Sequence, residues 1–174
     1  QNGHPEIARL LLAASAAVDQ AKDGGATPLF IACQKGQLEC ARLLLGASAA
    51  VNQAKNSGGT PLYIACQEGH LECAQLLLEA GAALNQARND GATPLFIASQ
   101  EGHFECAQLL RDAGAAANQA CNNGTTPLCM ACQQGQLECA QLLLEVGAAT
   151  DQAMNDGTPP LSAASLAGEI GCVR

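Results

Sequence analysis

Thiols and imidazoles are the side chains of this 174-residue sequence that could do chemistry, since they can bind a metal ion or supply a nucleophile and its base. Four of the ten cysteines fall within 19 residues, at Cys121, Cys129, Cys132 and Cys139, and Cys129 and Cys132 form a C-x-x-C motif. A structural zinc site usually combines two such pairs, but the sequence offers no second one. Zinc binding is therefore the minority interpretation, and core packing is preferred.

The positions of the cysteines favour packing. Nine of the ten recur in three columns of a 33-residue period: Cys33, Cys66 and Cys132; Cys40, Cys73, Cys106, Cys139 and Cys172; and Cys129 in a column that otherwise holds Phe. Cysteine behaves as a small buried hydrophobic residue. Residues of one column in neighbouring repeats should lie ~8–10 Å apart, too far for a disulfide. We therefore expect free thiols and an intracellular, cytoplasmic protein.

Histidine and glutamate recur in the same way, which argues against catalysis. The three histidines, His4, His70 and His103, share a column with Gln37 and Gln136, so an active site there would have to tolerate repetition and replacement. Glutamates repeat in the first turn of the second helix of the four complete blocks, at Glu39, Glu72, Glu105 and Glu138, where the helix dipole favours them. No unique nucleophile, acid–base pair or phosphate-binding loop remains. The sequence predicts no enzyme, no cofactor and no metal site.

The elements that position these residues must pack without a large aromatic core, because four residues are aromatic and 35 are alanine. The net charge is −8, and residues 61–174 carry three basic and twelve acidic side chains. Nucleic acid would be repelled, and a charge-steered protein partner of that region should be basic.

No apolar stretch approaches the ~20 residues of a membrane-spanning helix. No signal peptide is visible, although a start elsewhere would hide one.

A 33-residue period organises the chain, because Thr-Pro-Leu begins at Thr27, Thr60, Thr93 and Thr126. Alignment on this period gives complete blocks 22–54, 55–87, 88–120 and 121–153, and partial blocks 1–21 and 154–174. In the third complete block, Thr93 can cap a helix that Pro94 begins and Gly102 ends. A second helix begins near Phe104 and stops at Gly114. Helices this short must stack on neighbouring pairs to be stable.

This pattern resembles the ankyrin repeat, in which D-x-x-G-x-T-P-L-H-x-A-A-x-x-G-H precedes a leucine-rich helix and G-A-x-x-N. The resemblance covers the whole chain. In the third complete block it is carried by residues 90–98, Gly102-His103, Leu109-Leu110, Gly114-Ala115 and Asn118. It implies an all-α solenoid of stacked helix pairs with protruding β-hairpin-like turns, in a single array over residues 1–174. It also implies a non-enzymatic scaffold or adaptor that binds protein.

The family's histidine after Thr-Pro-Leu is replaced in every block, by Phe30, Tyr63, Phe96, Cys129 and Ser162. We expect these side chains to fill the space between repeats, with a hydrophobic binding row as the alternative. Ser15 and Ser48 stand where later blocks have a helix-ending glycine, so those ends should be less stable. Arg111 replaces a leucine and should point outward or find an acidic partner, which would thin the core locally.

The two partial blocks also depart from the pattern. Pro5 falls at the start of a helix, where proline is tolerated. Pro159-Pro160 replaces Thr-Pro, and Gly171 replaces the usual glutamate, so we expect the last repeat to be degenerate.

The resemblance implies a surface of turn tips and first-helix positions, which we call the recognition face. Its predicted residues are Asp23, Gln34, Lys35, Asn56, Ser57, Gln67, Glu68, Asn89, Asp90, Gln100, Glu101, Asn122, Asn123, Gln133 and Gln134. Its column of four glutamines could hydrogen-bond an extended chain, and a merely solvated face is an equal alternative. Without Trp, Arg or exposed Tyr anchors, we expect modest affinity.

Three turn asparagines, Asn52, Asn85 and Asn118, occupy a position where the resemblance implies that asparaginyl hydroxylases can act. The alternative is that they bond their local backbone, as should Asp19 and Asp151 in the same column. Two rival functions stay open. The chain could target a larger enzyme whose catalytic domain lies elsewhere, or it could be a structural spacer without a specific partner.

Overall fold

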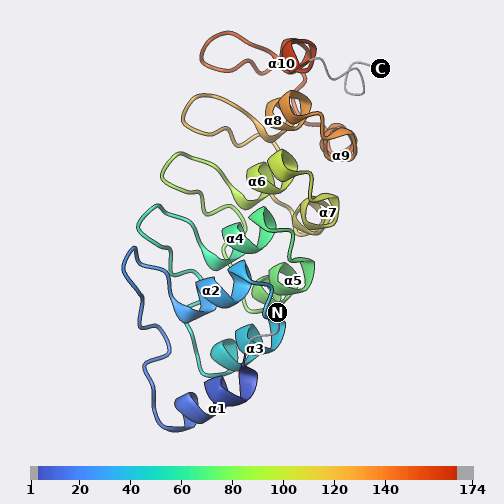
Figure 1. Ribbon diagram of the computed structural model, residues 1–174. Coiled ribbons are helices and arrows are strands. Elements are labelled where there is room, and N and C mark those ends of the chain that lie inside the picture. Colours follow the sequence, from blue (N-terminus) through green and yellow to red (C-terminus); the bar gives the residue numbers. More distant parts are fainter. Residues whose placement is uncertain (1–3, 168–174) are drawn as a thin grey trace. The chain divides into compact units, whose positions relative to one another are not determined.

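The regular structure that the computed structural model describes, over residues 4–167, is helical: ten α-helices and no strand in that range (Figure 1). This confirms the predicted all-α class. The chain forms two compact units, residues 1–83 and 84–174. The boundaries of the repeats remain a prediction.

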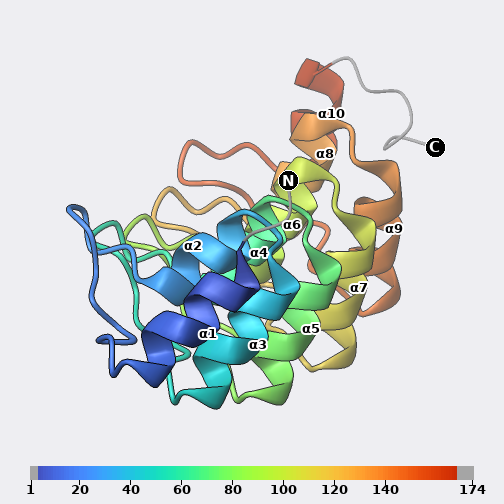
Figure 2. The same ribbon diagram turned by 60° about the horizontal axis from the view of Figure 1, so that its bottom comes forward.

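In the first unit the helices form two layers (Figure 2). One layer holds α2 (Pro28–Gln34) and α4 (Pro61–Gln67), and the other holds α1 (Pro5–Ala13), α3 (Leu38–Gly46) and α5 (Leu71–Glu79). α2 pairs with α3 and α4 with α5, each across a three-residue connection. α2 also packs on α4, while α3 packs on α1 and α5. The predicted stacking of helix pairs is thus present.

The second unit repeats this arrangement. Its helices are α6 (Pro94–Glu101), α7 (Phe104–Asp112), α8 (Pro127–Gln134), α9 (Leu137–Glu145) and α10 (Pro160–Ala167). α6 pairs with α7 and α8 with α9, and α8 packs between α6 and α10. The long loops before α8 and α10 project beyond the first helices (Figure 1).

Four first helices, α2, α4, α6 and α8, begin as predicted, with a threonine cap and a proline. The Oγ1 atoms of Thr27, Thr60, Thr93 and Thr126 accept a hydrogen bond from the backbone N–H three residues on, at 3.1–3.2 Å. The bond satisfies a donor that the helix leaves unpaired, and proline has no N–H to satisfy. Pro5 and Pro160 likewise begin α1 and α10. Gly171 lies outside the described residues.

Left-handed residues end the helices at the predicted places. Gly102 follows α6 with a φ of 75°. Gly81 and Gly114 follow second helices with φ of 84° and 87°. Ser15 and Ser48 adopt the same conformation with φ of 63° and 67°, although their Cβ atoms disfavour it. The two helix ends expected to lack a favourable glycine therefore carry backbone strain.

Leucines form the core between the layers of each unit. Eight of them are at most 2% exposed: Leu29, Leu62, Leu77, Leu95, Leu110, Leu128, Leu142 and Leu143. Burial of each contributes ~1.5–3 kcal/mol. Phe30, Tyr63, Phe96 and Cys129 are also buried, so core packing is confirmed for these four and an exposed hydrophobic row is wrong. Ser162 is exposed.

Arg111 lies at the edge of the core. The leucines of its column are half-buried, apart from Leu144, which is 47% exposed. Arg111 Nη2 lies 2.8 Å from Asp112 Oδ1, and Nη1 lies 3.5 Å from Glu145 Oε2. The arginine therefore has acidic partners, and the expected thinning of the core does not follow, because the position is peripheral.

Candidate functional site

The predicted recognition-face residues lie on turns and first helices in both units, and none of them is buried. In the first unit Asp23, Lys35, Asn56 and Glu68 are exposed, whereas Gln34, Ser57 and Gln67 are half-buried. In the second unit Asn89, Asp90, Glu101, Asn122, Asn123, Gln133 and Gln134 are exposed, whereas Gln100 is half-buried. Each unit thus presents an accessible, mostly uncharged polar surface.

The turn tips are joined to one another by backbone hydrogen bonds. The N–H of Asn56 donates to the carbonyl of Gly24 at 3.0 Å, and the N–H of Asn122 donates to that of Asp90 at 2.8 Å. Asn122 Nδ2 also donates to the carbonyl of Asn89 at 2.9 Å. These bonds hold neighbouring turn tips in register. Some of the asparagine amides on the recognition face therefore stabilise the fold.

Glycine is required where the tips touch. Gly91 has a φ of 86°, and a Cβ there would lie 2.8 Å from the backbone nitrogen of Asn122. Gly25 and Gly124 have equally little room beneath the next tip. The turn geometry therefore positions the recognition face through both backbone conformation and close packing.

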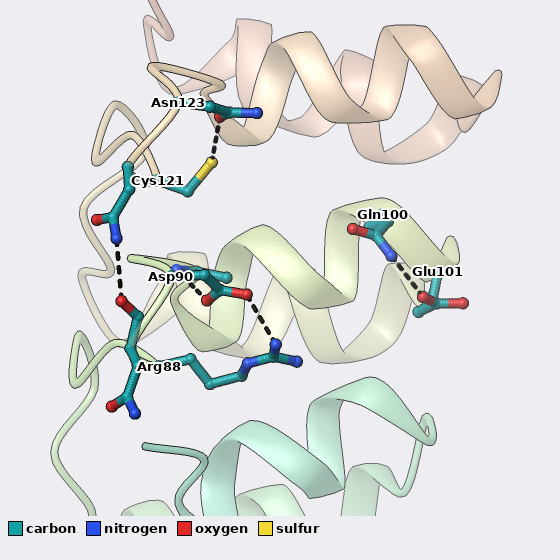
Figure 3. Close-up of polar contacts among 9 residues, drawn as sticks. Arg88, Asp90, Gln100, Glu101, Cys121 and Asn123 are labelled. Carbon is teal, nitrogen blue, oxygen red and sulfur yellow. Dashed lines mark hydrogen bonds and ion pairs between the residues drawn. The ribbon is translucent and has the colours of Figure 1, made fainter. Parts of the chain in front are cut away.

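Two glutamines of the column donate to the glutamate that follows them in the chain. Gln100 Nε2 donates to Glu101 Oε1 at 2.8 Å, and Gln67 Nε2 donates to Glu68 Oε1 at 3.4 Å. Figure 3 shows the Gln100–Glu101 pair beside the Arg88–Asp90 ion pair, whose Nη2–Oδ2 distance is 2.7 Å. The amides of Gln67 and Gln100 are thus each held by a carboxylate at the end of the same helix.

A pocket of about 320 Å³ lies on the recognition face of the second unit. Buried Phe96 and half-buried Met130 supply its apolar lining, while Asp90, Gln100 and Cys121 supply polar groups. The Cys121 thiol donates to Asn123 Oδ1 at 2.8 Å (Figure 3). We call this the Phe96 pocket. A second hollow of about 300 Å³, one period further on, is lined by residues that include Gln133, Gln134 and Asp156.

The structure thereby adds Phe96, Cys121 and Met130 to the predicted face. The sequence predicts Phe96 as a core residue, with a hydrophobic binding row as the alternative, and it gives Met130 no role in a site. Cys121 is the sequence feature that could have indicated this pocket. Its column holds Lys22, Lys55 and Arg88 in the preceding blocks, so the cysteine replaces a long cationic side chain.

The turn asparagines do not bond their local backbone, so that expectation is wrong. Asn52 Oδ1 accepts from the N–H of Ala83 at 2.7 Å, and Asn85 Oδ1 accepts from that of Ala116 at 3.0 Å. Asn118 and Asp19 do the same with Ala149 and Ala50. The partner lies 31 residues further along the chain in every case, so the column ties one repeat to the next.

Nine cysteines lie in the described part of the chain, and none of them forms a disulfide bond. Seven are buried, as predicted, while Cys40 and Cys121 are half-buried and Cys172 lies outside the described residues. A hydrogen bond to Cys73, together with burial, raises the pKa of the Cys33 thiol, and the same bond lowers the pKa of Cys73. These two thiols belong to different columns, so their contact was not predicted.

Within residues 4–167, no group of three or more His, Cys, Asp or Glu side chains is arranged so that it could hold a metal ion.

The histidine column lies between repeats. The His70 imidazole lies directly over Gly36, where an added Cβ would be 2.7 Å from its Cε1 and Nδ1 atoms. Gln136, in the same column, donates from Nε2 to the carbonyl of Gln100 at 3.2 Å. These side chains cover the ends of the preceding first helices, which supports their predicted structural role.

The fold and this face define a protein of stacked helix-turn-helix repeats. The family model for ankyrin repeats (3 copies) matches residues 1–55, 48–121 and 113–174, so the chain belongs to the ankyrin-repeat family. The predicted solenoid class of stacked repeats is thereby confirmed. Ankyrin repeats are generally protein–protein interaction modules and typically non-enzymatic. No curated protein matches the chain. None of the described helices is long and apolar enough to cross a membrane.

Proposed function

We propose that this chain is a non-enzymatic scaffold or adaptor whose recognition face binds protein. The observation that carries the proposal is the exposure of polar side chains in each unit, on turns fixed by backbone bonds between neighbouring tips. Such preorganised turns reduce the ordering cost of binding. The small, polar side chains favour modest affinity. We place the protein inside the cell because none of its nine described cysteines forms a disulfide bond.

The test is affinity capture from lysate with the full chain and with a variant carrying Gln67→Arg, Gln100→Arg and Asp90→Lys. Circular dichroism must first show that both fold alike. Proteins retained by the parent and lost by the variant would support recognition through this face. Equal retention, or none, would overturn the proposal and favour a spacer or a targeting module that depends on other domains.

A further inference from the structure

The position in the first unit that corresponds to the Phe96 pocket is filled by a lysine side chain. There, the Lys55 ammonium lies 5.2 Å from the centroid of the Phe30 ring. Phe96 follows Phe30 by 66 residues, and Cys121 follows Lys55 by 66 residues, which is two periods in both cases. The repeat itself thus contains a site where a cation covers this ring, a favourable cation–π arrangement.

Cys121 leaves the counterpart in the second unit without a cation, and Phe96 there is 5% exposed. Its side chain ends at a sulfur atom, which is turned toward Asn123 Oδ1 at 2.8 Å. The pocket of about 320 Å³ lies where a lysine side chain would otherwise extend. The volume is at the low end of ligand pockets, a size suited to one side chain.

The surroundings of the pocket favour a cation. Asp90 takes the place of Gly24 in the first unit and adds to the pocket wall a carboxylate whose Oδ2 lies 2.7 Å from Arg88 Nη2. Residues 84–167 carry eight acidic and two basic side chains, and both basic ones, Arg88 and Arg111, are already ion-paired. The excess of negative charge attracts a positively charged partner to this unit.

We propose that the Phe96 pocket binds a lysine or arginine side chain from a basic, extended segment of a protein partner. The cation takes the place over Phe96 that Lys55 takes over Phe30, and its aliphatic stem lies against Met130. The Gln100 amide oxygen accepts a hydrogen bond from it, and the cation shares the Asp90 carboxylate with Arg88. This inference rests on the proposed function, because it takes the partner to be a protein.

Cys121→Lys is the decisive variant, because it restores the internal cation of the first unit and fills the pocket. Cys121→Ala removes the same thiol without filling the space. Gln141→Arg adds the same charge on the exposed surface of α9, in a column where Arg42 is the natural residue. Asp90→Asn preserves the turn, since Asn123 one period later accepts the equivalent backbone bond, from Thr125 at 3.0 Å.

The probe is the peptide acetyl-Gly-Ser-Arg-Ser-Gly-amide, titrated into the ¹⁵N-labelled full chain at low salt. The parent should bind with a Kd on the order of 1 mM, with shifts at Ala92 and residues 121–123. Cys121→Lys should weaken binding roughly tenfold and Asp90→Asn several-fold, while Cys121→Ala and Gln141→Arg change it less than about twofold. A peptide with neutral citrulline in place of arginine should bind roughly tenfold more weakly.

Equal binding of the arginine and citrulline peptides would overturn the inference, as would a Cys121→Lys variant that binds like the parent. Equal losses in Cys121→Lys and Gln141→Arg would also overturn it, because net charge alone would then explain binding. The affinity capture from lysate distinguishes failure of this inference from failure of the proposed function. A partner lost from the triple variant but retained by Cys121→Lys supports the face and refutes the pocket. Pocket-specific peptide binding without any captured partner refutes only the proposed function.

Discussion

Asn52 Oδ1 accepts a hydrogen bond from the backbone N–H of Ala83 at 2.7 Å, across 31 residues of chain. The acceptor stands in one repeat and the donor in the next, so the bond contributes to the interface between repeats. Short helices that cannot stand alone depend on such interfaces. The column is therefore a structural element of the stack, in addition to any modification it undergoes.

Asn52→Ala should lower the free energy of unfolding by ~1–2 kcal/mol, because the partly buried N–H of Ala83 loses its acceptor. Urea unfolding followed by circular dichroism measures this as a lower midpoint. Asn52→Asp is the matched control. Asp19 accepts the equivalent bond from Ala50 at 3.0 Å, so the aspartate variant should stay near the parent. Equal midpoints for the alanine and aspartate variants would contradict a role for this bond.

Ser48→Gly should stabilise the chain by ~0.5–1 kcal/mol, because it relieves a left-handed residue that carries a Cβ. The reverse change, Gly81→Ser, should destabilise it by a similar amount. The two positions are equivalent, with φ of 67° and 84°, and a Cβ at Gly81 would meet no atom within 4 Å. The pair therefore isolates backbone strain from crowding.

Urea midpoints of the two variants, measured against the parent, test this prediction. A rise for Ser48→Gly and a fall for Gly81→Ser are expected. If both substitutions lowered the midpoint, the serine hydroxyl rather than φ would govern this helix end, and the strain argument would be wrong.

The sequence was sufficient to predict features with local causes. Thr93 and Pro94 start a helix, and Gly102 ends it, because caps and φ preferences act within a few residues. The 33-residue period then predicts the stacking, since a short amphipathic pair must bury its stripe against another.

Features that depend on two repeats could not be predicted in this way. The period shows that Asn52 belongs to a column, but not that Ala83 is its partner. The Phe96 pocket arises from a short residue in one repeat beside a ring in another, so neither Phe96 nor Cys121 marks it alone. Contacts between different columns, such as Cys33 with Cys73, need the packed structure.

The pKa of Cys139 predicts alkaline sensitivity in the second unit. Burial, helped by the negative charges of Glu138 and Glu105, raises this pKa from 9.0 to about 11. The folded state thus holds the thiol proton more tightly than the unfolded state does. This contribution to stability is complete below about pH 9 and is lost as the pH rises toward 11.

Urea midpoints of the parent and of Cys139→Ala, compared at pH 8 and pH 10.5 under reducing conditions, measure this contribution. The parent should lose more stability than the variant over this interval, because the other titrating groups are common to both. Equal losses would show that Cys139 does not titrate differently in the folded chain.

Alkylation is an independent test of how well the folded chain protects the Cys139 thiol, because the thiolate is the species that reacts. With iodoacetamide at pH 8, half-exposed Cys121 should be modified first, whereas Cys139, 1% exposed, should react only after denaturation. Peptide mass mapping of partly modified chains resolves the order. Modification of Cys139 before Cys121 would contradict both its raised pKa and its burial, because only a folded structure that protects this thiol delays its reaction.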